Sequence, residues 1–178
     1  MKKLVIVYGL IAGAVVAAMM FISIPLWRSG FLLGTFGAVI GYSTMVIAFA
    51  PTIFIAIKSY RDGYRNGVIS FWNGVRIGVL ITLVASLIYS LSWEITYRNF
   101  MPDFMEKYSV AHFEKMERSG ASAEEIASER AEWAALAEWY KNPVLRFGMT
   151  MMEIFPVGLG ITLLSAGLLR KRQLLPAS

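Results

Sequence analysis

The chain has 178 residues, of which 57% are hydrophobic and only 16% charged, and its formal net charge is +5. An ordinary water-soluble domain carries about 25% charged residues, so this composition excludes that class. Cysteine is absent, which excludes disulfides and thiolate metal sites, and a single histidine narrows metal chemistry further. A chain of this length is expected to form one domain.

Four long apolar runs predict helices that cross a membrane. They cover about residues 4–26, 31–57, 71–97 and 144–169. Each reaches the ~20 residues that a helix rising about 1.5 Å per residue needs to cross about 30 Å of hydrocarbon. The first run has no polar face at any periodicity, so lipid is the solvent that suits it. It follows Lys2 and Lys3 and continues to Leu26, which favours an uncleaved anchor over a secretory signal.

Small residues recur in the first three runs at spacings that let helices approach closely. The predicted packing stripes are Gly9, Gly13 and Ala17 in the first run, Gly34, Gly37 and Gly41 in the second, and Gly74, Gly78 and Ala85 in the third. They favour packing of the four helices on one another, with self-association through one exposed stripe as the alternative. Pro51 and Pro156 each remove a backbone donor and are expected to bend the second and fourth helices.

The basic residues predict an orientation. They precede the first run (Lys2, Lys3), lie between the second and third or just inside the third (Lys58, Arg61, Arg65, Arg76), and follow the fourth (Arg170, Lys171, Arg172). Only Arg28 lies between the first two runs. The positive-inside rule therefore places both termini and residues 58–70 in the cytoplasm and residues 98–142 outside. We interpret the net charge as a topology signal and expect no nucleic-acid partner.

The cytoplasmic segment 58–67 interleaves basic and aromatic residues and is read as a turn. Lys58, Tyr60, Arg61 and Arg65 form a candidate site for anionic lipid headgroups. The alternative is an ordinary topological anchor, with a turn at Asn66-Gly67 and with Asp62 paired to Arg61 or Arg65.

The external segment, residues 98–142, is the one region with the patterning of a soluble helix. A helix is expected from Asp103 to Arg118, ended by Ser119-Gly120. Ser122 then begins a Ser-Ala-Glu-Glu capping box that predicts a second helix over 123–140. The two helices should form an external hairpin.

Aromatic residues near the end of this hairpin are candidates for docking an envelope protein. They are Trp133, Trp139 and Tyr140. The alternative is that these side chains lie in the membrane interface or pack on one another.

Glu153 is the one carboxylate deep inside an apolar run, about 13 Å from its outer boundary. An ionisable group at that depth is a hypothesis for a functional site. Thr82 or Ser86 in the third run could form a hydrogen bond with it, and Arg76, closer to the inner boundary, could pair with it. Three interpretations stay open: a neutral hydrogen-bonded carboxyl group that holds helices together, an ion pair with Arg76, or a proton or cation pathway.

Several sequence blocks occur in the order expected of a known family. They are Gly41-Tyr42-Ser43-Thr44-Met45-Val46, Lys58-Ser59-Tyr60-Arg61-Asp62, Gly67-Val68-Ile69-Ser70-Phe71, Gly78 to Tyr89 with Trp93, and Glu153-Ile154-Phe155-Pro156-Val157-Gly158. Through them the chain resembles the bacterial membrane family called domain of unknown function 4199 over nearly its whole length. The resemblance implies a four-span bacterial membrane protein with an extended segment before the last span, and it implies no activity.

Together these features predict an all-α integral membrane bundle of four transmembrane helices, as a single domain, with an extramembrane helical hairpin between helices three and four. The expected location is the bacterial cytoplasmic membrane, with both termini cytoplasmic. We predict a non-catalytic structural or accessory protein that contacts membrane lipids and either an envelope protein or a second copy of itself, and we expect no metal or cofactor. The alternative is a small transporter or ion pathway that uses Glu153.

Catalysis is not expected, because the candidate motifs are incomplete. Gly41-Tyr42-Ser43-Thr44-Met45 begins like a nucleophile elbow but lacks the final glycine. The single histidine, His112, lies on the external hairpin, far from that serine.

Overall fold

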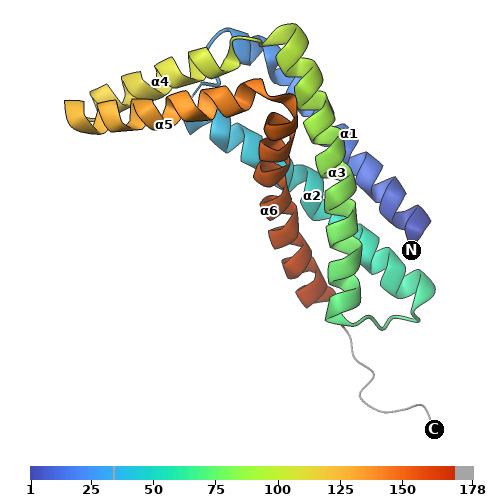
Figure 1. Cartoon of the computed structure of the whole chain (residues 1–178). Helices are drawn as coiled ribbons and strands as arrows, with labels where there is room; N and C mark the ends of the chain where they lie inside the picture. Colours follow the sequence, from blue (N-terminus) through green and yellow to red (C-terminus); the bar gives the residue numbers. More distant parts are fainter. Residues whose placement is uncertain (34, 171–178) are drawn as a thin grey trace.

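The computed structural model describes residues 1–33 and 35–170, and these form six helices (Figure 1). The helices are α1 (Lys2–Arg28), α2 (Thr35–Tyr64), α3 (Phe71–Phe100), α4 (Phe104–Arg118), α5 (Ala123–Lys141) and α6 (Pro143–Leu169). Helices α1, α2, α3 and α6 are long and apolar enough to cross a membrane. The predicted all-α fold is confirmed: a four-span bundle with a helical hairpin between the third and fourth spans. Gly34, Lys171 and Arg172, used in the sequence analysis, lie outside the described residues.

The second span differs from its predicted bounds at both ends. It begins at Thr35 instead of residue 31, because the chain turns at Gly30, which has a left-handed φ of 83°, and Leu33 donates its N–H to the Gly30 carbonyl at 3.1 Å. The prediction of a turn from Lys58 was wrong, since α2 continues to Tyr64. A membrane-spanning helix needs apolar side chains only inside the hydrocarbon layer. The charged last turns of α2 therefore continue the helix beyond that layer.

The four spans form a ring. Helix α3 packs against α1 and α6, and α2 closes the ring by packing against the same two helices. We call the end that carries α4 and α5 the hairpin end, and the end that carries the α2–α3 connection, residues 65–70, the loop end. The loop end also holds the last turn of α6, while α4 and α5 extend to one side of the bundle at the opposite end (Figure 1).

Small residues on α1 let it approach α3 closely. A Cβ atom placed at Gly9 would lie 2.7 Å from the Cβ of Val84, and one placed at Gly13 would lie 2.9 Å from the Cβ of Ile88. Both separations are too short for real side-chain contacts, so glycine is required at these two positions. The predicted packing role of this stripe within the chain is confirmed.

Helices α3 and α6 pack antiparallel in a register that repeats every four residues. Gly74 lies against Ala166, Gly78 against Thr162, and Gly158 against Thr82. A step of four residues forward along α3 corresponds to a step of four residues backward along α6. Continued in the same way, this register places Glu94 of α3 opposite Arg146 of α6, and these two residues form an ion pair. Between them, the register places Ser86 opposite Ile154 and Ser90 opposite Thr150. All four of these residues are buried. A glycine or small residue at successive contacts brings the two backbones together.

The hydrophobic core occupies the loop-end half of the ring. All four spans contribute residues without exposed surface, with Ala12 from α1, and the largest of these side chains are Phe49, Ile53, Ile57, Ile77, Ile81 and Ile154. Pro51 lies inside a continuous α2 and is exposed, and Thr52 donates its hydroxyl to the Ala48 carbonyl at 2.6 Å. Pro156 likewise lies inside a continuous α6. The bends expected at the two prolines stay a prediction.

The hairpin forms as its sequence predicts. Ser122 and Glu125 make both hydrogen bonds of the capping box, at 3.2 Å and 2.8 Å, and Asn142 caps α6 by accepting from the Val144 N–H at 2.9 Å. Trp133 packs on the His112 ring with centroids 4.8 Å apart, and the His112 Nε2 lies 3.0 Å from the Glu129 carboxylate. These contacts hold α4 and α5 together.

Candidate binding cavity

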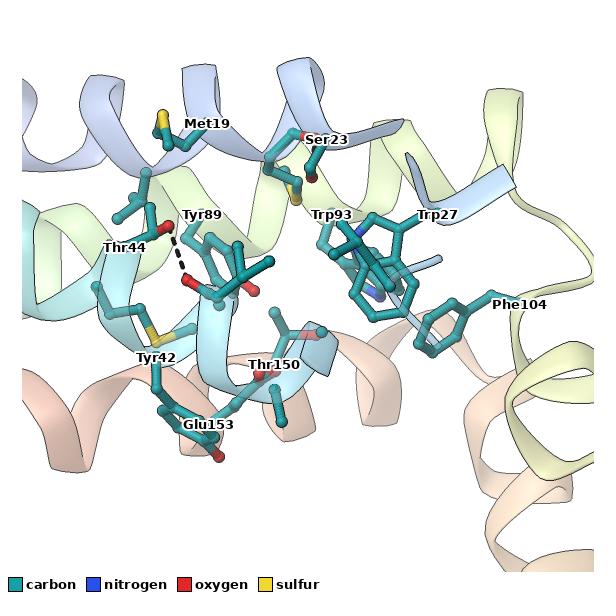
Figure 2. A pocket seen from close by; sticks show the side chains of 18 of the residues that line it. Met19, Ser23, Trp27, Tyr42, Thr44, Tyr89, Trp93, Phe104, Thr150 and Glu153 are labelled. Carbon is teal, nitrogen blue, oxygen red and sulfur yellow. Dashed lines mark hydrogen bonds between the residues drawn. The ribbon is translucent and has the colours of Figure 1, made fainter. Parts of the chain in front are cut away.

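A cavity of about 580 Å³ occupies the hairpin-end half of the bundle (Figure 2). Small-molecule sites typically have volumes of about 300–1,000 Å³ and mostly apolar walls with a few polar groups, and this cavity fits both criteria. Its walls come from α1, α2, α3 and α6, and residues of α4 and α5 line its hairpin end. The aromatic and polar lining residues are Ser23, Trp27, Tyr42, Thr44, Tyr89, Trp93, Phe104, Tyr108, Tyr140, Thr150 and Glu153.

Gly41 of α2 borders the open space of the cavity. A Cβ atom at Gly41 would meet nothing within 4 Å, and Gly41 lines the cavity. Gly37 packs against the Leu32 backbone just before α2 and against the ring of Trp27 in the last turn of α1. The prediction that this stripe packs against a neighbouring span was therefore wrong for Gly41, where the missing side chain leaves open space.

The loop-end floor of the cavity is tightly packed. On the loop-end side of the lining residues, each helix places a buried side chain: Ala12 on α1, Phe49 on α2, Ala85 on α3 and Ile154, directly after Glu153, on α6, all with no exposed surface. All four belong to the hydrophobic core. The cavity is thus a space with one closed end. Its sides are partly open, and the lining residues Ile22 and Tyr42 are exposed on the bundle surface.

Aromatic rings form the roof at the hairpin end. Phe104 packs edge-on against Trp27 and Trp93, with centroids 5.6 Å and 4.9 Å away (Figure 2). Trp93 donates its Nε1–H to the Tyr140 hydroxyl at 2.6 Å. Burial raises the pKa of the Tyr140 phenol well above its usual range, so the hydroxyl keeps its own proton. The roof connects α1, α3, α4 and α5 and fixes the base of the hairpin over the cavity.

The three aromatic residues considered for partner docking have different surroundings. Tyr140 is buried in the roof, and Trp133 is half-buried inside the hairpin. Trp139 is 61% exposed. Two of the three therefore pack within the chain, and only Trp139 presents its ring to the surface.

Glu153 lines the cavity and has an exposed side chain (Figure 2). Within the described part of the chain no hydrogen bond or ion pair involves its carboxylate. The structure does not bring it together with Thr82 or Ser86, whose buried hydroxyl oxygens have no hydrogen-bond partner in the described residues. Thr82 instead packs against Gly158.

Arg76 is also separate from Glu153. It is exposed and lies close to the loop end of α3, several turns from Tyr89, the nearer of the two α3 residues that line the cavity with Glu153. Among the described residues no ion pair joins Arg76 to Glu153. Two of the three interpretations of Glu153 relied on such contacts. Among the described residues, neither the ion pair with Arg76 nor the hydrogen bonds to Thr82 and Ser86 are formed.

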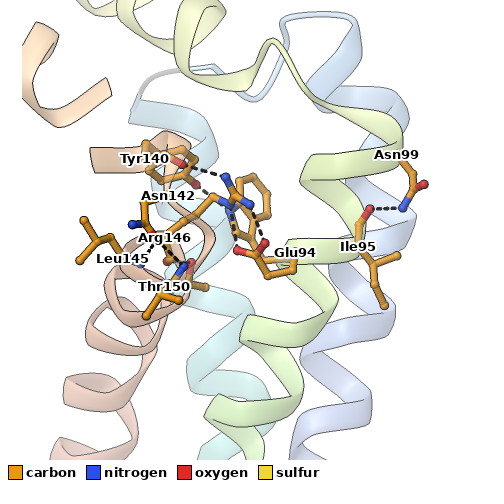
Figure 3. Close-up of polar contacts among 10 residues, drawn as sticks. Glu94, Ile95, Asn99, Tyr140, Asn142, Leu145, Arg146 and Thr150 are labelled. Atoms are coloured by element: carbon orange, nitrogen blue, oxygen red, sulfur yellow. Dashed lines mark hydrogen bonds and ion pairs between the residues drawn. The ribbon is translucent and has the colours of Figure 1, made fainter. Parts of the chain in front are cut away.

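Sequence reasoning missed the principal buried ion pair, which joins Arg146 of α6 to Glu94 of α3 (Figure 3). Arg146 is 4% exposed and binds the carboxylate through Nε at 2.8 Å and Nη2 at 2.6 Å. Its Nη1 donates to the Tyr140 carbonyl at 2.8 Å, and its guanidinium lies 4.1 Å from the Tyr97 ring centroid. The pair joins α3, α5 and α6 beside the cavity roof. The four-residue spacing shared by α3 and α6 was the signal that could have found it.

The candidate headgroup residues lie on the last turns of α2 and, for Arg65, directly after it. The Tyr60 and Tyr64 rings stack with centroids 5.5 Å apart, and the Arg65 guanidinium lies 5.9 Å from the Tyr60 centroid. Arg61 pairs with Asp62 at 2.6 Å, and Lys58 is exposed. The predicted turn at Asn66-Gly67 is present, with φ of 48° and 80°. Headgroup binding by these residues stays a prediction.

Comparison with known proteins supports the resemblance on which the sequence analysis drew. Residues 7–171 match the model of a family described as Protein of unknown function (DUF4199). No curated protein and no solved structure matches the chain.

Proposed function

Because this chain belongs to the DUF4199 family, whose description carries no activity, we propose its function from its geometry: it is a non-catalytic accessory protein of the membrane that holds an amphipathic molecule in the cavity under the hairpin. The observation that carries this proposal is a cavity of about 580 Å³ that is apolar, partly open at its sides and closed toward the loop end. A molecule already dissolved in the bilayer can reach such a space from the side.

The closed floor favours binding over passage. A pathway across the bundle would have to continue through the layer of Ala12, Phe49 and Ile154, and these residues have no exposed surface. A transport role is the second candidate, because Glu153 faces the cavity and carboxylates inside membranes often mark ion pathways. Proton or cation flux in liposomes that disappears in Glu153→Gln would favour transport over binding.

We place the protein in a bacterial cytoplasmic membrane, with both termini and the loop end in the cytoplasm. The support is the cluster of Lys58, Arg61 and Arg65 at the loop end, since short cytoplasmic loops are enriched in basic residues. The cavity then lies in the outer half of the bilayer, and anionic headgroups of the inner surface are the partners that this basic cluster fits.

The cysteine-free chain allows a direct test of this orientation. A membrane-impermeant maleimide should label Gly120→Cys, at the tip of the hairpin, in intact cells. It should label Gly63→Cys, near the loop end, only after the cells are opened. Nothing lies within 4 Å of either position, so neither substitution should disturb packing; cysteine at position 120, where φ is 82°, adds backbone strain only in the exposed turn. The reverse labelling pattern would overturn the orientation.

A protein partner is a further element of the proposal. The exposed Trp139 ring is the part of the hairpin that is available for an envelope protein or a second copy of the chain. Aromatic rings that remain exposed are enriched at protein interfaces and at the membrane surface.

Filling the cavity tests the proposed function. A long-chain alcohol that bears a diazirine, added to liposomes containing the protein, should crosslink to the wild type on illumination. Gly41→Met should reduce this labelling at least about fivefold, because a side chain at position 41 points into open cavity space and does not clash.

Gly160→Met is the matched control, because Gly160 also meets nothing within 4 Å and does not line the cavity. Both substitutions replace a helical glycine and should slightly raise helix stability. Equal labelling of Gly41→Met and Gly160→Met would contradict binding in the cavity.

A further inference from the structure

The cavity carries a carboxyl group for which the described residues supply no positive partner. Glu153 lines the cavity and makes no hydrogen bond or ion pair within the described residues. The nearby cation Arg146 is fully engaged by Glu94, the Tyr140 carbonyl and the Tyr97 ring. Arg76 lies close to the loop end, on the far side of the packed floor. A carboxylate left unpaired in a membrane is costly, so a cation supplied from outside the chain would relieve that cost.

The remaining walls suit the same kind of cation. Tyr42, Tyr89, Trp93 and Tyr140 line the cavity together with Glu153, and aromatic faces attract organic cations, most strongly where water is excluded. Met19, Met20 and Met149 add polarisable apolar surface for a hydrocarbon body. A small inorganic cation would leave most of the volume empty, and it would meet only one carboxylate where metal sites require several oxygen ligands.

The charge balance excludes the opposite class of ligand. An anionic amphiphile would bring two negative charges together in an apolar space, which is unfavourable at any reasonable dielectric constant. A neutral amphiphile would fill the volume but would leave the carboxylate without a counter-ion.

We infer that the cavity binds a lipophilic organic cation, with the positive group near Glu153 and the apolar body extending toward the Trp27 and Phe104 end of the cavity. This inference rests on the proposed function and names the chemical class of its ligand. The cation enters from the bilayer through the partly open sides of the cavity, and Glu153 is the residue that selects its charge.

Two ions of nearly identical shape and opposite charge test the inference. Tetraphenylphosphonium and tetraphenylborate are measured for binding to the protein in nanodiscs of zwitterionic lipid, with empty nanodiscs subtracted. The phosphonium should bind the wild type at least about tenfold more tightly than the borate, the ratio that corresponds to about 1.4 kcal/mol. This comparison needs no variant, so it also decides the matter if a substitution at Glu153 does not fold.

Substitution of the carboxylate gives the second measurement. Glu153→Gln should weaken phosphonium binding about tenfold and bring the two ions closer in affinity. Glu124→Gln, at the exposed start of α5, removes the same charge outside the cavity and should leave both affinities unchanged. Unchanged phosphonium binding in Glu153→Gln would overturn the inference.

Gly41→Met separates the inference from the proposed function. If the wild type binds both ions equally and Gly41→Met abolishes both, the cavity binds ligands but does not select for positive charge, and the inference fails alone. If Gly41→Met leaves the binding of both ions intact, the ions bind elsewhere, which counts against the proposed function and the inference together.

Discussion

Arg146→Met should lower the free energy of unfolding by about 3–5 kcal/mol, the usual cost of removing one partner of a buried ion pair. The substitution leaves Glu94 half-buried without its cation, and it also removes the hydrogen bond to the Tyr140 carbonyl and the contact with the Tyr97 ring. The loss can be measured by unfolding in mixed detergent micelles, with tryptophan fluorescence as the signal.

Two further variants show that the loss comes from the unpaired charge. Glu94→Leu combined with Arg146→Met should recover most of the stability, because replacing both charges by apolar groups is often neutral or better. Lys141→Met removes an exposed partner of Glu138 and should cost less than about 1 kcal/mol. A single Arg146→Met variant within about 1 kcal/mol of the wild type would show that the pair does not hold α3 and α6 together.

Gly78→Thr should destabilise the bundle by about 1–3 kcal/mol, because a Cβ atom at position 78 overlaps the side chain of Thr162. The neighbouring step of the same register has the opposite arrangement, with Thr82 on α3 facing Gly158 on α6. Exchanging the two residues, as Gly78→Thr with Thr162→Gly, reproduces that arrangement and should therefore restore most of the stability.

A control at Gly160 distinguishes contact from helix propensity. Gly160→Thr places the same side chain on α6 where nothing lies within 4 Å, and it should cost little. The thermal midpoint of each variant in detergent gives the comparison. If the exchanged pair were as unstable as Gly78→Thr alone, the two positions would not be in contact and the four-residue register would be incorrect.

The fold could be predicted because its signals are local. A run of about 20 apolar residues predicts a membrane span without reference to the rest of the chain. The capping box of Ser122 and Glu125 likewise needs only residues that are close in sequence. The end of α2 was harder to place, because helix propensity does not stop where the hydrocarbon stops and charged residues such as Arg61 continue the same helix.

The candidate site depended on partners far apart in the sequence. Arg146 and Glu94 are 52 positions apart, and either one alone resembles an ordinary residue at the end of a span. Gly41 follows Gly37 at the four-residue spacing of a packing glycine, yet it lines open space. Whether such a glycine packs against a helix or borders a cavity depends on the course of α2 relative to α1 and α6. For Glu153 the sequence predicts a depth in the membrane, but it could not predict which side chains surround the carboxyl group.

The position of the photolabel on the wild-type chain tests the central claim most directly. After crosslinking with the diazirine-bearing alcohol and proteolysis, mass spectrometry should find the label on the cavity walls, in residues 16–27 of α1, 37–45 of α2 and 149–153 of α6. The loop-end half of α2, residues 46–57, is of similar apolar character and should carry little label, because its inward face is packed in the core. Equal labelling of both halves of α2 would mean that the probe only coats the lipid-facing surface, and it would contradict a binding cavity under the hairpin.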